Sequence, residues 1–387
     1  MRKAIIVLLC LTPIFSFATE MTNGDNPKGV KGLVSGIGRF IDSMTVRGVD
    51  PRYIEAPQKP WQIIANGNIS QSDLKLSSLM NAQDFGSDTE EYLKWEPRIK
   101  TDISTYAGLW VGYRGYGIGY SWNVGGDKGR ILTFGATGGS YGVNLRIHAF
   151  ENNEPEVNIF GKYYDEEESP DEPMYLSDKG GYLLMSPINV RTLMLDGYYL
   201  FNGKRFSYSA AYDQSVIQKR SAGSVMAGFM YYHSHIKYDT DVNADFIFMM
   251  NDIGAIKQWQ ASVGAGYAYN LVPCKGLLIN AMAMPMLTFY NRYKVWRYDS
   301  NLKQGILAED DEDIYDDLLE WKIYPEEKSD NHGKMTVNID ARVSLTYQYR
   351  QFFFNVYGQL NRFPYKDKKV KGRLYDWHVN AAVGIRL

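Results

Sequence analysis

The run His233-Ser234-His235 comes closest to a catalytic group, and Asp239 and Asp241 follow it. A histidine can take the proton of a serine hydroxyl when the two side chains touch and an acidic residue orients the imidazole, as in lipid hydrolases. Neighbouring side chains of a strand point to opposite faces, so His233 could not reach Ser234 without a bulge. We therefore expect no enzyme and interpret the run as polar residues near the rim of a strand.

Metal and nucleotide chemistry have little support either. His233 and His235 would share a face, but the chain has five His and two Cys, and a zinc site needs further ligands at about 2 Å. The glycine runs 112–119 and 135–142 lack the Lys-Ser/Thr ending of a phosphate loop. They favour turns and strand packing. We expect no metal and no cofactor.

A third set of residues is polar or charged and alternates with apolar residues, so its side chains should share one face of a sheet. They are Asn144, Arg146, His148, Asp340, Arg342, Gln348, Asn380 and Arg386. We predict that they point into a lumen. There they could line a water-filled passage, or pair with one another across a closed interior.

The elements that would position these residues are strands. Val337 to Tyr349 alternates strictly between apolar and polar residues, and the same pattern runs to Leu387. Such alternation is typical of strands with one apolar and one wet face. We predict twelve strands, at 61–79, 97–110, 115–124, 130–138, 140–151, 187–200, 220–236, 256–270, 276–291, 335–350, 351–362 and 374–387.

The connections between these strands indicate how they are arranged. Those after even-numbered strands are mostly short, whereas those after odd-numbered strands include the long segments 80–96, 152–186 and 292–334. Short inner turns and long outer loops are typical of transmembrane barrels. We predict an all-β fold, an antiparallel transmembrane β-barrel of about 12 strands (10–14), with short periplasmic turns and long acidic extracellular loops. Residues 201–219 do not fit this parity, and we assign them to the periplasmic side or the barrel interior.

Composition excludes other classes. The mean hydropathy is -0.34, and no apolar run approaches the roughly 20 residues of a spanning helix. A net charge of -2 gives no sign of nucleic-acid binding.

The N-terminal residues predict export. Residues 1–18 combine Arg2 and Lys3 with an apolar stretch and the small residues Ser16 and Ala18, which is typical of a signal peptide cleaved after Ala18. We predict an N-terminal periplasmic extension at 19–60 and the barrel at 61–387. Cleavage would leave Cys274 alone, without a partner for an internal disulfide.

The two longest predicted loops are acidic. Residues 152–186 hold nine acidic and two basic side chains, and residues 292–334 hold twelve and seven. They could bind divalent cations that bridge lipopolysaccharide phosphates, give a pore a cation preference, or form a solvated, repulsive surface. The expected partners are outer-membrane lipid and lipopolysaccharide, and the barrel assembly machinery that would insert the chain.

Two passages resemble an uncharacterised family of outer-membrane barrel proteins from Bacteroidetes, known only as a domain of unknown function. The first is Asp50-Pro51-Arg52-Tyr53-Ile54-Glu55, and the second is Phe206-Ser207-Tyr208-Ser209-Ala210-Ala211-Tyr212 with its continuation Gln218-Lys219-Arg220-Ser221-Ala222-Gly223-Ser224. The likeness runs from about Asp50 to Leu387. It implies a barrel in the outer membrane of a Gram-negative bacterium and implies no chemistry.

The leading functional hypothesis is therefore a non-enzymatic channel or solute-passage protein. The alternative is a structural or surface-interaction barrel whose acidic loops bind a partner, a glycan or lipopolysaccharide. A third hypothesis is an outer-membrane lipid-modifying enzyme that would use His233, Ser234 and His235.

Overall fold

The structure is a computed structural model that describes residues 48–81, 90–100, 103–126, 128–165, 169–181, 183–237, 253–298, 323–366 and 370–387. The predicted signal peptide, residues 19–47 of the predicted extension, and the acidic runs 166–168 and 309–313 lie outside these residues. Within the described part of the chain, no helix has the length and apolar character needed to cross a membrane.

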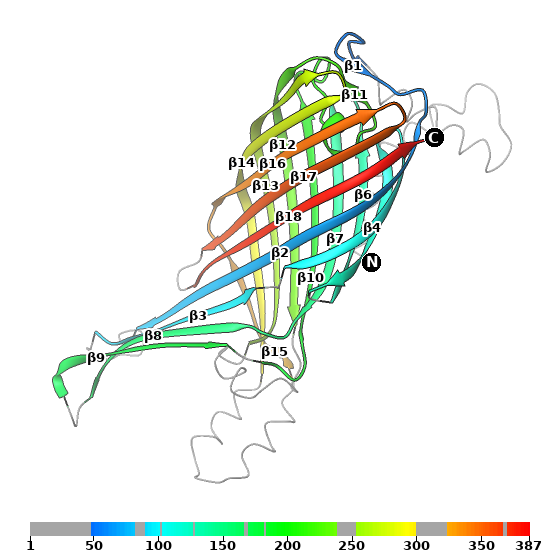
Figure 1. Cartoon of the computed structure of the whole chain (residues 1–387). Coiled ribbons are helices and arrows are strands. Elements are labelled where there is room, and N and C mark those ends of the chain that lie inside the picture. Colours follow the sequence, from blue (N-terminus) through cyan, green and yellow to red (C-terminus); the bar gives the residue numbers. More distant parts are fainter. Residues whose placement is uncertain are drawn as a thin grey trace.

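Twelve antiparallel strands form a closed barrel (Figure 1). In spatial order they are β2 (Trp61–Asn81), β4 (Ser104–Tyr113), β5 (Tyr116–Gly125), β6 (Gly129–Thr137), β7 (Tyr141–Asn152), β10 (Ile188–Leu200), β12 (Ala222–Lys237), β13 (Ile253–Cys274), β14 (Leu277–Tyr298), β16 (Thr336–Tyr349), β17 (Phe352–Lys366) and β18 (Val370–Arg386). β18 pairs with β2 and closes the sheet. The predicted fold class is confirmed.

Alternation along β16 separates the two faces of the wall. Asp340 is fully buried and Arg342 is 7% exposed, whereas Val343 is 60% exposed. A strand with a polar face toward a lumen and an apolar face toward lipid produces this pattern. The register of the strands then determines which inward side chains are neighbours. Arg342, for example, lies opposite Met282 of β14 and Gln359 of β17.

Tight connections gather at one end of the barrel, here called the short-turn end. Arg114-Gly115 joins β4 to β5, Lys275-Gly276 joins β13 to β14, and Arg350-Gln351 joins β16 to β17. Arg114 and Arg350 have left-handed backbones, with φ of 53° and 56°. The other end is the long-loop end.

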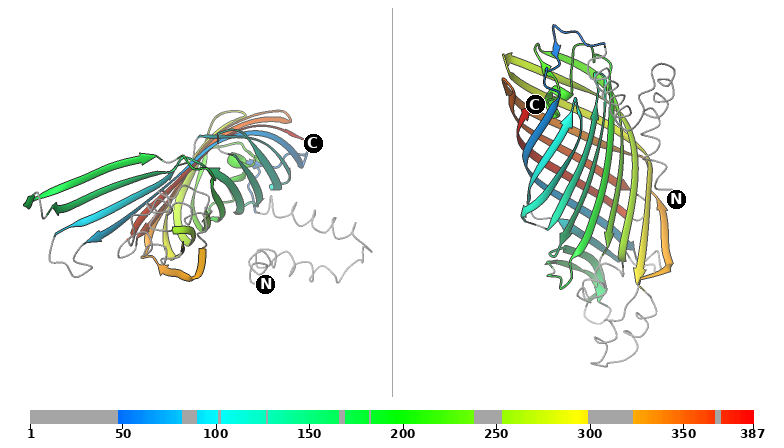
Figure 2. Two further views of the ribbon diagram at one scale, coloured as in Figure 1. Left: turned by 90° about the horizontal axis from the view of Figure 1, so that it is seen from below. Right: turned by 90° about the vertical axis from the view of Figure 1, so that its right-hand side faces the viewer.

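Three further strands lie in segments that the sequence had indicated as loops: β8 (Glu156–Asp165), β9 (Ser169–Gly181) and β15 (Ile323–His332). A fourth, β3 (Tyr92–Lys100), lies across the end of the predicted loop 80–96 and the start of the predicted strand 97–110. The predicted strand 97–110 is wrong at its start, because residues 97–100 belong to β3 and the barrel strand β4 begins at Ser104. β3, β8 and β9 extend the sheet from β2 away from the barrel at the long-loop end (Figures 1 and 2). Strands outside lipid need no strict apolar alternation, so this periodicity did not reveal them.

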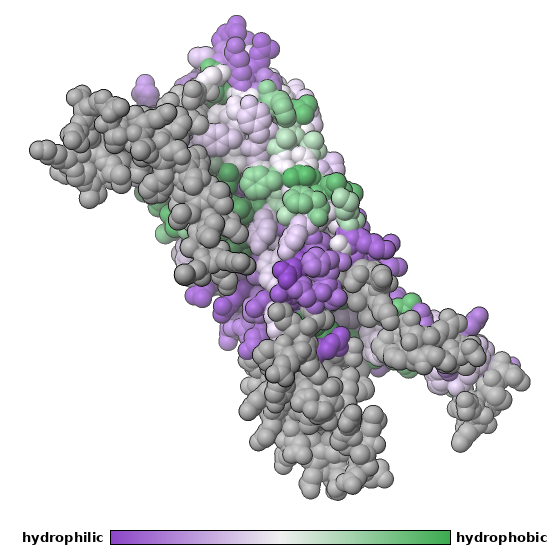
Figure 3. All heavy atoms as spheres, turned by 180° about the vertical axis from the view of Figure 1, so that it is seen from behind, coloured by the Kyte–Doolittle hydropathy of each residue, from purple (hydrophilic) through white to green (hydrophobic). Residues whose placement is uncertain are grey.

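Apolar side chains form a belt around the outside of the wall, and Figure 3 shows part of it as a band between hydrophilic regions. Val225, Val263 and Val383 are each about half exposed. At the short-turn end the belt finishes in exposed aromatic residues: Trp61, Phe201, Tyr349 and Phe352. A belt bordered by aromatic side chains is typical of a barrel that spans a membrane.

Residues 201–219, here called the plug, enter the barrel from the short-turn end. They include the single helical turn α3 (Ser209–Tyr212) and β11 (Ile217–Gln218), and Phe206, Ala210 and Ala211 are fully buried. β11 pairs with β1 (Ile54–Glu55). This pairing joins the two passages on which the family resemblance rests.

Candidate functional site

Side chains of the barrel wall hold the plug by its backbone carbonyl groups. Asn355 Nδ2 donates to Ala211 O at 3.0 Å, and Asn270 Nδ2 donates to Ser207 O at 2.7 Å. Arg386 Nη2 donates to Gln214 O at 2.8 Å. Because backbone carbonyls buried without a partner are costly, these wall residues make the barrel interior a suitable environment for a non-strand segment.

Two plug residues shape the segment itself. Gln218 Oε1 accepts from Ser207 N at 2.9 Å, and its Nε2 donates to the carbonyl groups of Arg205 and Arg220. Gln214 has a left-handed backbone with φ of 56°, and its carbonyl oxygen accepts hydrogen bonds from the wall. The plug is therefore a locally braced turn rather than a loose loop.

Asp213 lies where the plug meets β6. Its Oδ2 accepts from Thr137 Oγ1 at 2.5 Å, and its Oδ1 accepts from Ser215 N at 2.8 Å. Burial raises the pKa of Asp213 to about 6, and hydrogen bonds from Ser215 and Thr137 oppose the rise. Asp213 also lines a cavity inside the barrel, and its burial leaves the charged form of the carboxyl poorly hydrated.

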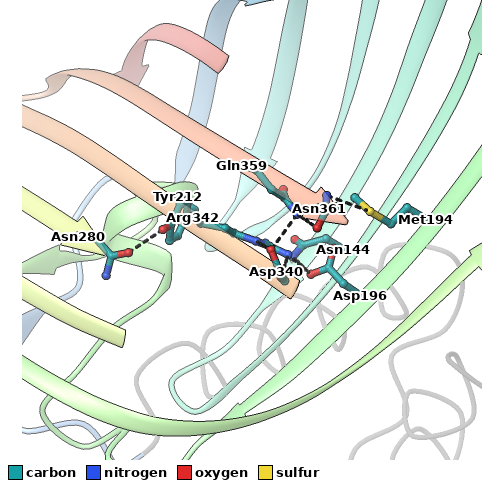
Figure 4. A network of polar contacts seen from close by, with 9 residues as sticks. All are labelled: Asn144, Met194, Asp196, Tyr212, Asn280, Asp340, Arg342, Gln359 and Asn361. Atoms are coloured by element: carbon teal, nitrogen blue, oxygen red, sulfur yellow. Dashed lines mark hydrogen bonds and ion pairs between the residues drawn. The ribbon is translucent and has the colours of Figure 1, made fainter. Parts of the chain in front are cut away.

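An ion cluster spans the lumen deeper in the barrel (Figure 4). Arg342 of β16 contacts Asp340 at 2.7 Å and reaches Asp196 of β10 at 3.0 Å, although β12, β13 and β14 lie between the two strands in the sheet. Asn144 Nδ2 donates to Asp196 at 3.0 Å, and Gln359 Nε2 donates to Asp340 at 3.3 Å. Two carboxylates and one guanidinium thus link β10 to β16 across the lumen.

A second pair crosses the lumen between other strands. Arg146 of β7 contacts Asp376 of β18 at 3.3 Å, and β2, β4, β5 and β6 lie between them. Ser72 Oγ donates to Asp376 at 2.9 Å, and His378 Nδ1 lies 3.4 Å from Arg146 Nη1. The lumen is thus bridged at two places by charged side chains.

Aromatic rings connect the plug to the wall. The ring of Tyr208 lies 4.3 Å from those of Tyr198 and Tyr212, and Tyr212 lies 5.8 Å from Tyr357. The Arg342 guanidinium carbon is 5.9 Å from the centre of the Tyr208 ring. These contacts couple the position of the plug to the ion cluster, because Tyr208 packs against both.

A cavity of about 170 Å³ lies between the plug and the cross-lumen pairs. Asn66 Oδ1, Asn68 Oδ1 and Arg146 Nη2 line it, are buried, and have no protein partner within the described residues. Polar atoms in this situation are satisfied by water or by a polar solute.

The glycine run of β5 has a spatial role beside this cavity. A Cβ atom at Gly117 or Gly119 would lie 2.7–2.8 Å from the indole of Trp110, and one at Gly135 would lie 3.0 Å from it. Trp110 also lines the cavity. The glycines therefore leave the space that the indole occupies. A larger cavity of about 660 Å³, with Lys100, Glu151 and Glu156 in its wall, lies at the long-loop end.

The residues expected to face the lumen all lie inside the barrel wall. Four of them line the cavity: Asn144, Arg146, Arg342 and Asn380. Asp340 belongs to the ion cluster, His148 Nε2 lies 2.9 Å from Tyr106 Oη, and Arg386 Nη2 donates to Gln348 Oε1 at 3.2 Å.

The residues of the weak catalytic candidate do not come together. Ser234 is 5% exposed, whereas His233 stacks on Trp259 with ring centres 5.0 Å apart, and its Nδ1 lies 2.8 Å from Gln258 O. His235 lies on the strand face of His233, away from Ser234. Asp239 and Asp241 lie outside the described residues. Among the described side chains, no three or more His, Cys, Asp or Glu residues are grouped so that they could hold a metal ion.

Sequence reasoning missed several residues of the lumen. Asp196 is a lone acidic residue in the apolar strand β10, and this was an available signal because an unpaired buried charge is costly. Asp376 and His378 continue the alternation of β18 toward its start. Tyr208 and Tyr212 lie in the segment that did not fit the strand parity, but their contacts depend on how the plug enters the barrel, which no local pattern shows.

The chain resembles solved outer-membrane proteins at low sequence identity. The outer membrane protease OmpT from Escherichia coli matches with a TM-score of 0.37 and 8% identity, over 85% of this chain and 97% of that one. OprG from Pseudomonas aeruginosa matches with 0.28 and 10%, over 85% and 98%. The translocator domain of the autotransporter NalP from Neisseria meningitidis matches with 0.29 and 9%, over 92% and 96%.

No curated protein matches the chain. A family match covers residues 49–386, which includes the plug and all twelve barrel strands. The chain belongs to the family described as Domain of unknown function (DUF4421).

Proposed function

We propose that this barrel lies in the outer membrane of a Gram-negative bacterium and is a passage for small polar solutes, closed in the described state by its plug. The cavity of about 170 Å³ carries this proposal. It lies inside the barrel, its wall includes buried polar atoms that find no protein partner among the described residues, and a segment that is not part of the wall covers it at one end.

In the resting state the lumen is closed at more than one position along its length. The plug occupies the short-turn end, and the Arg342 and Arg146 pairs cross the lumen beyond it. Conduction then requires release of the plug together with rearrangement of these pairs. The contact between Tyr208 and Arg342 supplies a physical link between the two events.

Single-channel recording in planar bilayers tests this proposal. We expect the wild-type chain to open rarely. A chain in which a short Gly-Ser turn replaces residues 203–219, with Arg342→Ser and Arg146→Ser, should conduct persistently. If this variant remains a folded barrel, migrating faster unboiled than boiled on a detergent gel, and yet does not conduct, the proposal is wrong.

A disulfide that holds the plug to the wall, and that reductant breaks, provides the matched experiment. Thr137 and Asp213 are in contact, so a Thr137→Cys/Asp213→Cys pair in a Cys274→Ser background should form a disulfide between wall and plug. We expect oxidation to abolish the rare openings and reductant to restore them. The Thr137→Cys/Cys274→Ser chain is the control, and its openings should not respond to oxidation.

The long-loop end favours a second candidate, a surface-interaction protein. The projecting strand β9 forms a sheet edge and exposes Met174, Tyr175 and Leu176, of which Tyr175 is 71% exposed. Exposed apolar groups on a projecting sheet suit contact with a partner. A folded, plug-free barrel without conductance would favour this candidate over the passage. We propose no enzymatic role, since His233 and Ser234 lie on opposite faces of β12.

A further inference from the structure

We infer that the short-turn end carries a ring of basic side chains that binds the anionic headgroups of phospholipids in the adjoining membrane leaflet. This inference is independent of whether the lumen conducts. The ring residues are Lys59, Arg114, Lys204, Arg220, Lys275 and Arg350; all are exposed except Arg114, which is partly buried.

The ring follows the circumference of the barrel. One basic residue lies in each of the turns β4–β5, β13–β14 and β16–β17, and one precedes β2. The other two, Lys204 and Arg220, lie in the segment that connects β10 to β12. Residues 138–140, the turn between β6 and β7, are Gly-Gly-Ser and form the single gap among the described connections at this end. Hydrogen bonds connect neighbouring parts of the rim, including Arg114 N to Pro60 O at 3.0 Å and Lys59 Nζ to Gln351 Oε1 at 2.8 Å.

The ring lies next to the aromatic border of the apolar belt. Trp61 is 51% exposed and Phe352 is 49% exposed, and the Arg350 guanidinium carbon lies 5.3 Å from the centre of the Tyr349 ring. Aromatic side chains of membrane proteins lie at the depth of the lipid headgroups. Basic groups directly beyond them are therefore at the depth of the phosphates.

Acidic side chains at this rim are paired with other residues. Asp50 binds Arg52 at 2.8 Å, and Glu55 lies 3.5 Å from Lys219. Asp213 faces the cavity inside the barrel. The described part of this end consequently keeps an excess of positive charge toward the membrane surface.

The distribution of the basic side chains around the rim favours lipid over a protein partner. A bilayer surrounds a barrel on all sides, so its headgroups can meet charges in nearly every turn at once, whereas a protein docks on one patch. Basic groups close to a membrane surface attract anionic lipid, and salt weakens this attraction. Phosphodiester headgroups such as phosphatidylglycerol have the chemistry that these side chains recognise.

Electron paramagnetic resonance of spin-labelled lipids tests the inference on the full chain reconstituted in phosphatidylcholine vesicles. We expect spin-labelled phosphatidylglycerol to associate at least about fivefold more strongly than spin-labelled phosphatidylcholine at low salt, the factor expected from one basic residue near a surface. The preference should fall toward one at 0.5 M NaCl.

The test variant is Arg114→Asn/Lys275→Asn/Arg350→Asn, because asparagine tolerates the left-handed backbones of positions 114 and 350. It should lose most of the preference. The control neutralises three exposed lysines elsewhere, Lys128→Gln/Lys179→Gln/Lys334→Gln, and should keep it.

Equal association of both lipids with the wild-type chain, or an equal loss in the control, would overturn the inference and leave the rim to a partner other than lipid. If the triple variant does not fold, Lys275→Asn alone and the salt titration of the wild-type chain decide the question.

Discussion

Asp213 is the residue at which the plug should respond to pH. Burial raises its pKa from an ordinary 3.8 to about 6. Two ionisable side chains of the wall interact electrostatically with it, Arg386 of β18, whose positive charge favours the carboxylate, and Tyr198 of β10. Because the folded pKa lies above the unfolded one, docking favours the protonated acid.

The stability of the docked plug should therefore be highest below about pH 4, fall as the pH rises to about 6, and stay level above that. A shift of about two units corresponds to about 3 kcal/mol. Hydrogen exchange of residues 206–218 measures it, with a barrel strand as internal reference for intrinsic exchange. Asp213→Asn should abolish the pH dependence, while Glu55→Gln should preserve it. Protection of the wild-type plug that is level from pH 4 to pH 7 would contradict this prediction.

At the residue scale, the sequence predicted the strand face on which a side chain lies better than it predicted the residue that this side chain contacts. Alternation placed Arg146 and Arg342 on the inner face, because every second residue of a strand shares a face. It could not show that Arg342 meets Asp196, since the two residues are 146 positions apart in the chain. Such a contact depends on the diameter and register of the closed barrel.

At the element scale, the pairing of β1 with β11 ties the segment before the barrel to the plug. Ile54 is 3% exposed and packs in a small cluster with Ala210, Ala211 and Val216 of the plug, and with Leu278 of β14. The segment at 54–55 thus covers the plug from outside, and the strength of plug docking should depend on it.

Ile54→Ala should loosen the plug without unfolding the barrel. Truncation of a buried isoleucine costs about 2–5 kcal/mol, and here the loss falls on the β1, plug and β14 cluster. We expect faster hydrogen exchange in residues 206–218 and unchanged exchange in β13 and β16. Glu55→Ala is the matched control, because Glu55 is exposed and its change should leave the plug protected. Loss of protection throughout the barrel would show that the plug is part of the barrel core.

Elements that touch lipid were predictable, and those that do not were missed or left open. Alternation marked the barrel strands because their two faces meet different solvents. The plug residues Phe206, Tyr208, Ala210 and Tyr212 also alternate, yet they form a turn and α3. Their apolar positions are satisfied by the lumen, which no local pattern can reveal. No local pattern revealed β9 either, because its residues lie outside the barrel.

On the scale of the whole molecule, the apolar belt determines where the barrel sits in a membrane. β16 samples its full height, with Val337, Val343 and Tyr349 all pointing outward and all more than half exposed. Six residues of a strand rise about 20 Å, or about 16 Å along the membrane normal at a tilt of about 40°. Positions 337 and 349 therefore lie near the two edges of a belt about 25 Å tall when position 343 lies at its centre.

The loss of stability caused by arginine substitutions along β16 should depend on their depth in this belt. Val343→Arg should lower the free energy of unfolding by about 2–4 kcal/mol, because the guanidinium would face the hydrocarbon centre, while Val337→Arg and Tyr349→Arg should each cost about 0–1 kcal/mol. Urea titration of the three variants in phosphatidylcholine vesicles measures the difference. An equal cost at the three positions would mean that the belt does not face lipid. A maximum at position 337 or 349 would instead shift the membrane along the barrel axis, and would move the ring of basic side chains away from the headgroups.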